Sequence, residues 1–130
     1  MTRRVIGGPT DRELEILQVL WRLGRCSVRD VHDALLESEE VSFTTVQTML
    51  QVMFDKGLVE RELVRRAYWY WPAESQAETQ TTLVRSLMER AFGGSAKALV
   101  SRALDARRST PAELDEIQKL LDAAREAQDD

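Results

Sequence analysis

Apolar residues recur at helical spacing in two segments near the start of the chain. The first begins at Thr10, which forms a Thr-x-x-Glu pattern with Glu13 and predicts a capping box, in which the two side chains satisfy backbone amides. Gly24 ends this helix, and Ser27 is the N-cap of the second, which ends in an acidic run at 37–40. The apolar stripes contain Leu14, Leu17 and Trp21 in the first helix and Val28, Val31 and Leu35 in the second.

A third helix and two strands complete the first half of the chain. Ser42 is the predicted N-cap of a helix at about 43–56, whose buried face contains Val46, Met49, Leu50 and Met53. Two short runs rich in strand-forming residues follow at 58–64 and 67–71. Three helices and a β-hairpin in this order predict a winged helix-turn-helix domain, which we place at residues 1–73.

Three further amphipathic helices are predicted in residues 74–130. The first covers about 75–92 and ends at the glycine pair 93–94, and the second begins after Ser95. The third opens with Thr-Pro-Ala-Glu at 110–113, which combines a capping box with a proline at the first helical position. The chain is therefore predicted to be mainly α.

This second half is too small to bury a core of its own. Three short helices with fewer than about 60 residues in total leave most of their apolar surface in water. We therefore expect the segment to be a dimerisation domain, in which a second copy of the chain covers the apolar faces. The residues expected in the homodimer interface are Leu83, Leu87, Leu99, Val100, Leu104, Leu114, Ile117, Leu120 and Leu121.

The composition is that of a globular protein, with 43% apolar and 31% charged residues. No apolar run approaches the roughly 18 residues of a membrane span, and the start of the chain lacks the apolar core of a secretory signal. We therefore expect a cytoplasmic protein without membrane contact. A single cysteine, Cys26, and a single histidine, His32, cannot form an internal disulfide or a Cys/His zinc site, so no cofactor is predicted.

The net charge of −4 argues mildly against a nucleic-acid partner, because phosphate contacts normally need an excess of Lys and Arg. The acidic residues are unevenly distributed, however, and the chain is rich in them from Asp105 onward. A protein of this charge can therefore still have a basic face that binds DNA.

The exposed face of the third helix is predicted to contact DNA bases. Its side chains form hydrogen bonds without carrying charge, whereas a face selected for solubility usually contains Glu and Lys. Gln pairs with adenine, and the methyl group of Thr packs on that of thymine. The alternative is that these residues only tolerate solvent. The predicted base-reading residues are Thr44, Thr45, Gln47, Thr48 and Gln51.

Residues in and near the hairpin are candidates for contacts with phosphates or the minor groove. The set consists of Arg65 and Arg66 at the predicted tip, with Ser42, Lys56 and Arg61 nearby. The Tyr-Trp-Tyr-Trp run at 68–71 alternates across the second strand, so the tyrosines share one face and the tryptophans share the other. One of these two pairs is expected in the core.

Catalysis is poorly supported by the sequence. His32 is next to Asp33, but adjacent helical residues do not face each other, and no Ser or Cys nucleophile is placed beside them. Cys26 is either a redox-sensitive thiol or a small buried residue, and its position before an apolar helix favours burial. No enzyme activity is predicted.

The most distinctive motif is Val-Ser-Phe-Thr-Thr-Val-Gln-Thr-Met-Leu at 41–50, followed by Asp-Lys-Gly-Leu-Val at 55–59. In this motif the chain resembles the penicillinase repressor family (BlaI/MecI/CopY). Other segments are similar to the family's first two helices, wing strand and C-terminal half, so the resemblance covers nearly the whole chain. These segments are Glu13–Leu17 with Leu20-Trp21, Val28–Val31, Tyr68–Pro72, Gly93-Gly94, Leu99-Val100 and Thr110–Leu114.

The resemblance implies a repressor that binds an inverted-repeat operator in double-stranded DNA as a homodimer, with residues 42–56 as the recognition helix. In members that respond to β-lactams it also implies a regulatory protease, which cuts the C-terminal segment and separates the two linked readers. This chain departs from the family in three ways. Val52 replaces a frequent Arg, Arg102-Ala103 aligns with the cleaved Asn-Phe bond, and the cysteine cluster of copper-responsive members is absent.

A sequence-specific transcriptional repressor is the leading hypothesis. The alternative is a winged-helix protein-interaction module without specific DNA binding, which the net negative charge favours. Strong self-association without salt-dependent DNA binding would support that alternative. A third hypothesis is a ligand-sensing repressor with a pocket between the two halves, although the sequence shows no convergent polar cluster that would locate one.

Overall fold

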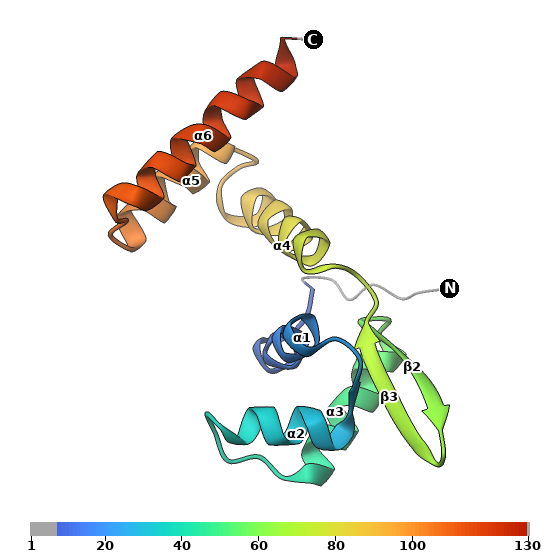
Figure 1. The fold of residues 1–130 in the computed structure, drawn as a ribbon. Helices are drawn as coiled ribbons and strands as arrows, with labels where there is room; N and C mark the ends of the chain where they lie inside the picture. Colours follow the sequence, from blue (N-terminus) through green and yellow to red (C-terminus); the bar gives the residue numbers. More distant parts are fainter. Residues whose placement is uncertain (1–7, 130) are drawn as a thin grey trace. The chain divides into compact units, whose positions relative to one another are not determined.

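The computed structural model describes residues 8–129, in which every helix and both hairpin strands expected from the sequence are present (Figure 1). The chain divides into two compact units between Ser86 and Leu87. The helices are α1 (Asp11–Leu23), α2 (Val28–Leu36), α3 (Phe43–Asp55), α4 (Gln76–Ala91), α5 (Ala96–Ala106) and α6 (Pro111–Gln128). The strands are β1 (Cys26–Ser27), β2 (Val59–Val64) and β3 (Ala67–Pro72).

The expected helix starts are confirmed by their capping hydrogen bonds. The backbone amide of Glu13 donates to Oγ1 of Thr10 at 3.2 Å, and the amide of Thr10 donates to Oε1 of Glu13 at 2.9 Å. Ser27 and Asp30 form the same reciprocal box at the start of α2. The side chains of Ser42, Ser95 and Thr110 each accept one backbone amide at the starts of α3, α5 and α6. These bonds fix where each helix begins.

The sheet contains one strand that the sequence did not reveal. Its order is β1-β3-β2, with both pairs antiparallel. The short β1 pairs Cys26 with Tyr70 and Ser27 with Trp69, so it exists only because β3 supplies the partner. Two residues are too few to show a strand period. This contact joins the start of α2 to the hairpin.

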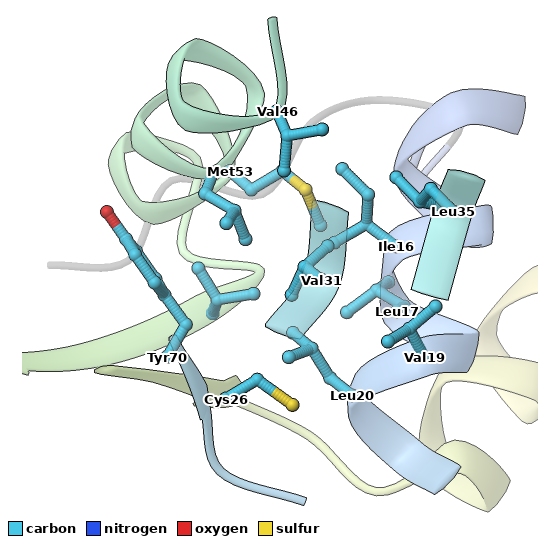
Figure 2. Packing of buried hydrophobic residues seen from close by; sticks show 12 residues of the cluster. Ile16, Leu17, Val19, Leu20, Cys26, Val31, Leu35, Val46, Met53 and Tyr70 are labelled. Atoms are coloured by element: carbon cyan, nitrogen blue, oxygen red, sulfur yellow. The ribbon is translucent and has the colours of Figure 1, made fainter. Parts of the chain in front are cut away.

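The core of the first unit lies between α1, α2, α3 and the sheet, as Figure 2 shows. Tyr70 is the one tyrosine of the alternating run that enters it, with 2% of its surface exposed, whereas Tyr68 is 38% exposed. The core therefore buries the inner face of α3, and the outer face of the helix is exposed to solvent. Its buried apolar residues are Ile16, Leu17, Val19, Leu20, Cys26, Val31, Leu35, Val46, Leu50, Met53, Val59 and Tyr70.

The second unit contains the end of α4 together with α5 and α6. None of the described side chains of these three helices is buried. Their apolar residues include Leu120, which is 70% exposed. Among the described residues, no helix has the length and apolar character needed to cross a membrane.

Candidate nucleic-acid interface

Helix α3 is held rigidly by its inner face. Val46, Leu50 and Met53 are fully buried at helical spacing, which fixes both the position and the rotation of the helix. The five residues predicted to read bases, Thr44, Thr45, Gln47, Thr48 and Gln51, all lie on its exposed surface. A rigid helix with an uncharged polar face is a suitable platform for base contacts.

A groove of about 720 Å³ separates α3 from the hairpin and the start of α2. Gln47, Thr48 and Gln51 line it, whereas Thr44 and Thr45 do not. The groove brings together residues that are distant in sequence, and none of its lining side chains carries a carboxylate. The lining consists of Ser27, Val28, Arg29, Phe43, Gln47, Thr48, Gln51, Val52, Arg66, Ala67, Tyr68 and Tyr70.

The predicted base-reading side chains differ in how much of their hydrogen-bonding capacity is already used. Within the described part of the chain, the side chains of Thr44, Gln47 and Thr48 have no hydrogen-bond partner. The hydroxyl of Thr45 accepts a hydrogen bond from Oγ of Ser42 at 2.8 Å, so this residue helps to cap the helix. Gln47 and Thr48 are therefore the predicted base-reading residues of the groove that are most available to a ligand.

Arg65 and Arg66 form the whole turn between the hairpin strands, because Val64 pairs directly with Ala67. Both arginines have positive φ, 50° and 70°, which is the backbone of a two-residue type I′ turn. Such turns favour Asn and Gly, and a left-handed conformation costs other residues about 1 kcal/mol each. Two exposed arginines therefore occupy a backbone position that favours other residue types.

The side chain of Arg61 contacts other residues of the first unit. Its guanidinium lies over the rings of both Phe54 and Tyr68, 4.0 Å and 4.1 Å from their centroids. Its Nη1 also donates to Oε1 of Gln51 at 2.6 Å, and Nε2 of Gln51 donates to Oδ1 of Asp55 at 3.3 Å. Arg61 thus connects β2 with α3 and β3.

Lys56 is also engaged, in an ion pair with a buried carboxylate. Its Nζ lies 2.8 Å from Oε2 of Glu13, which is only 4% exposed. Burial raises the pKa of Glu13, but hydrogen bonds from Lys56 and Thr10 outweigh this effect and hold the pKa below its ordinary value. The pair ties the start of α1 to the end of α3. The Lys56 ammonium is therefore already neutralised within the first unit.

Arg29 and Tyr68 are among the groove residues that were not predicted as site residues from the sequence. Arg29 lies in the first turn of α2, and Tyr68 lies on β3 beside the guanidinium of Arg61. Arg29 could have been found from its position, because the helix before a recognition helix crosses the DNA backbone. For Tyr68, the alternation of the run predicts only that it shares a face with Tyr70, because the strand register decides which face is directed toward α3.

Charge is distributed unevenly over the first unit. A second groove, between α1 and α2, is lined by Glu15, Glu37 and Glu39. On the hairpin, Glu60 and Glu62 pair across the strands with Trp71 and Trp69, so they share the tryptophan face and not the tyrosine face. The net charge of −4 therefore does not describe the groove beside α3.

The two residues considered for chemistry contribute to the fold. One ring nitrogen of His32, Nε2, lies 2.7 Å from the carbonyl oxygen of Val41, and its ring packs edge-on against Phe43. His32 thereby joins α2 to the start of α3. Cys26 is 1% exposed, as expected for a small buried residue, and burial raises the pKa of its thiol. Among the described residues, no group of three or more His, Cys, Asp or Glu could hold a metal.

Comparisons with known proteins agree with this architecture. Residues 9–123 match the sequence model of the family described as penicillinase repressor. The penicillinase repressor of Bacillus licheniformis is 24% identical over 87% of this chain and 88% of its own length. The transcriptional regulator BlaI of Mycobacterium tuberculosis is 34% identical over 68% of this chain and 65% of its own length.

One solved structure gives the corresponding spatial comparison. The solution structure of the DNA binding domain of the repressor BlaI has a TM-score of 0.51 and 27% sequence identity to this chain. It is matched over 92% of its length and covers 58% of this chain. The winged-helix fold expected for the first half is therefore confirmed.

Proposed function

Because the chain belongs to the penicillinase repressor family, we propose that it is a transcriptional repressor that binds an inverted-repeat DNA operator as a homodimer. The observation that carries this proposal is the groove between α3 and the hairpin. It presents Gln47 and Thr48 without internal partners, it contains two arginines, and its lining has no carboxylate. This chemistry suits a base edge flanked by phosphates.

In the proposed complex, α3 enters the major groove. Gln47 and Thr48 contact base edges, with Thr44 and Gln51 on the same exposed surface, while Ser42 and Thr45 chiefly stabilise the start of the helix. Arg65 and Arg66 reach the sugar-phosphate backbone or the minor groove from the hairpin tip. Arg29 contacts a phosphate from the start of α2.

The homodimer is proposed from the second unit, where the apolar residues lack an internal core. The exposed fraction is between 41% and 48% for Leu87, Val100, Leu104, Leu114 and Leu121. Leu99 and Ile117 of this unit are half-buried in one copy of the chain, as is Leu83, which precedes it in the first unit. A second copy would cover this surface and link two readers, which should protect half-sites about 10 base pairs, or a multiple of that distance, apart.

We propose no enzyme activity, and we place the protein in the cytoplasm because a repressor acts where its DNA is. A regulatory protease stays a prediction from the family resemblance. The bond aligned with the family's cleavage site, Arg102-Ala103, lies inside α5, so that helix would have to open before a protease could bind it.

Selection of bound sequences from a random DNA duplex pool tests the proposal. We expect enrichment of an inverted repeat that is bound far more tightly than random DNA. If a folded, self-associated protein enriches no sequence, the repressor function is wrong and the protein-interaction module is favoured.

Two sets of variants then separate base reading from phosphate binding. Replacing Gln47 and Thr48 with Ala should reduce discrimination between the selected repeat and random DNA, whereas Gln18→Ala on exposed α1 should not. Replacing Arg65 and Arg66 with Ala should weaken binding to all sequences and reduce the salt slope by about 0.9 for each phosphate that the variant no longer neutralises. Arg22→Ala on α1 is the matched charge control.

A further inference from the structure

The contacts of Arg61 suggest a role other than phosphate binding. Its guanidinium lies over the ring of Phe54 on α3 and over the ring of Tyr68 on β3. One of its nitrogens donates to Gln51, which is exposed on α3 and lines the groove. A side chain that contacts two aromatic rings and donates to a third group has little freedom to reach a phosphate.

We propose that Arg61 is a positioning residue that sets the orientation of the Gln51 amide and thereby determines specificity at one base pair of each half-site. This inference rests on the proposed function. The 2.6 Å bond from Nη1 of Arg61 to Oε1 of Gln51 joins the hairpin directly to a side chain on the recognition helix.

The hydrogen bonds to Arg61 and Asp55 distinguish the oxygen of the Gln51 amide from its nitrogen. A guanidinium can only donate hydrogen bonds, so the atom of Gln51 that faces Arg61 must be the oxygen. An ionised carboxylate can only accept, so the atom that faces Asp55 must be the nitrogen. A flip of the amide would place its N–H groups against the guanidinium and its oxygen against the carboxylate, and both contacts would become repulsive.

The oriented Gln51 amide can still form hydrogen bonds to a base. Its oxygen has a second lone pair, and its nitrogen has a second hydrogen, after the bonds to Arg61 and Asp55 are made. It can therefore present one acceptor and one donor in a set order. Adenine presents a donor at N6 and an acceptor at N7 in the major groove. A Gln51 amide whose oxygen and nitrogen cannot exchange places can therefore pair with this edge in one orientation only.

A double-mutant cycle measured on single-base variants of the selected operator tests the inference. The proteins are the full-length chain, Gln51→Ala, Arg61→Lys and the double variant. Lys keeps the positive charge but lacks the planar guanidinium, which stacks on aromatic rings and donates several hydrogen bonds in fixed directions. We expect Arg61→Lys and Gln51→Ala to lose about tenfold discrimination at the same base pair, without a change in salt slope. The double variant should be no worse than Gln51→Ala alone.

Other outcomes would overturn the inference. If Arg61→Met weakens all sequences equally and lowers the salt slope by about 0.9 while Arg61→Lys retains binding, Arg61 contacts a phosphate. If the losses of Arg61→Lys and Gln51→Ala add, the two residues act independently. Arg22→Lys on exposed α1 is the matched control and should leave discrimination at that base pair unchanged.

The same experiment separates the inference from the proposed function. A wild-type protein that enriches no operator contradicts both, whereas a specific wild-type protein with unchanged discrimination in Arg61→Lys contradicts only the role of Arg61. Thermal unfolding checks that each variant is folded. If Arg61→Lys does not fold, Tyr68→Leu removes one stacking ring and should cause a smaller loss at the same base pair, and no loss there would contradict the inference.

Discussion

The two units of this chain differ in what their apolar side chains contact. In the first unit, helices from one copy of the chain and a small sheet enclose residues such as Leu20 and Leu50, both 0% exposed. In the second unit, no described side chain of α5 or α6 is buried, and Leu120 is 70% exposed. Burial of apolar surface is the main source of stability. We infer that the first unit is stable by itself and that the second depends on another copy.

The sharpest contrast should come from the core of the first unit. Leu20→Ala removes a fully buried side chain and should lower the free energy of unfolding by about 2–5 kcal/mol. Leu23→Ala, on the same helix but 53% exposed, should change it by less than about 0.5 kcal/mol. Chemical denaturation of both variants measures this difference. Equal losses would show that the first unit lacks the core described.

A leucine-to-alanine substitution at an exposed position of the second unit should weaken the proposed dimer. Leu120→Ala should cost about 1–2 kcal/mol per protomer, because the proposed dimer buries this side chain. The loss should appear as a dimer that dissociates at higher protein concentration, measured by sedimentation. Leu23→Ala again serves as the exposed control. If Leu120→Ala behaves like Leu23→Ala, the side chain does not contact a partner.

The ion pair between Glu13 and Lys56 gives the first unit a pH dependence. Glu13→Gln should cost about 1–2 kcal/mol at neutral pH, because it removes the charge that Lys56 neutralises. The lowered pKa of Glu13 means that its contribution is complete above the ordinary carboxyl pKa and is lost as the pH falls through the lowered one. Denaturation at several pH values should therefore show wild type and variant converging in acid. A constant difference would contradict this.

The smallest effect, of opposite sign, is expected at the hairpin tip. Replacing Arg65 with Asn and Arg66 with Gly supplies the residues that a type I′ turn prefers and should stabilise the first unit by about 1 kcal/mol. The same variant should bind DNA more weakly, because both proposed backbone contacts are removed. Chemical unfolding measures the expected gain in stability, and a DNA titration measures the expected loss of affinity. A variant that is less stable would show that the arginines are not strained.

Local signals were sufficient to predict the helices and the hairpin. The Thr10 and Ser27 capping boxes and the apolar stripe of Val46, Leu50 and Met53 each depend on residues within two turns of one another. The strand β1 was missed because two residues carry no period, and its existence depends on β3, more than 40 residues away in the sequence.

The candidate site was predictable only in part, for a related reason. The polar face of α3 follows from the position of its apolar face, so its residues could be read from the helical period. The partners of Lys56 and Arg61 could not, because charge alone predicts exposed cations. Only the packing of α1 and the hairpin against α3 shows that Glu13, Phe54 and Tyr68 engage them.

In the proposed repressor, a DNA-binding unit that folds by itself is paired with a second one through a unit that needs another copy of the chain. The most direct test is a titration, with sedimentation, of the full-length protein on a duplex carrying both half-sites of the selected operator and on one with a single half-site scrambled. We predict two protomers on the intact repeat and much weaker binding to the scrambled duplex. One protomer bound with equal affinity to both duplexes would show that the chain does not bind DNA as a linked pair.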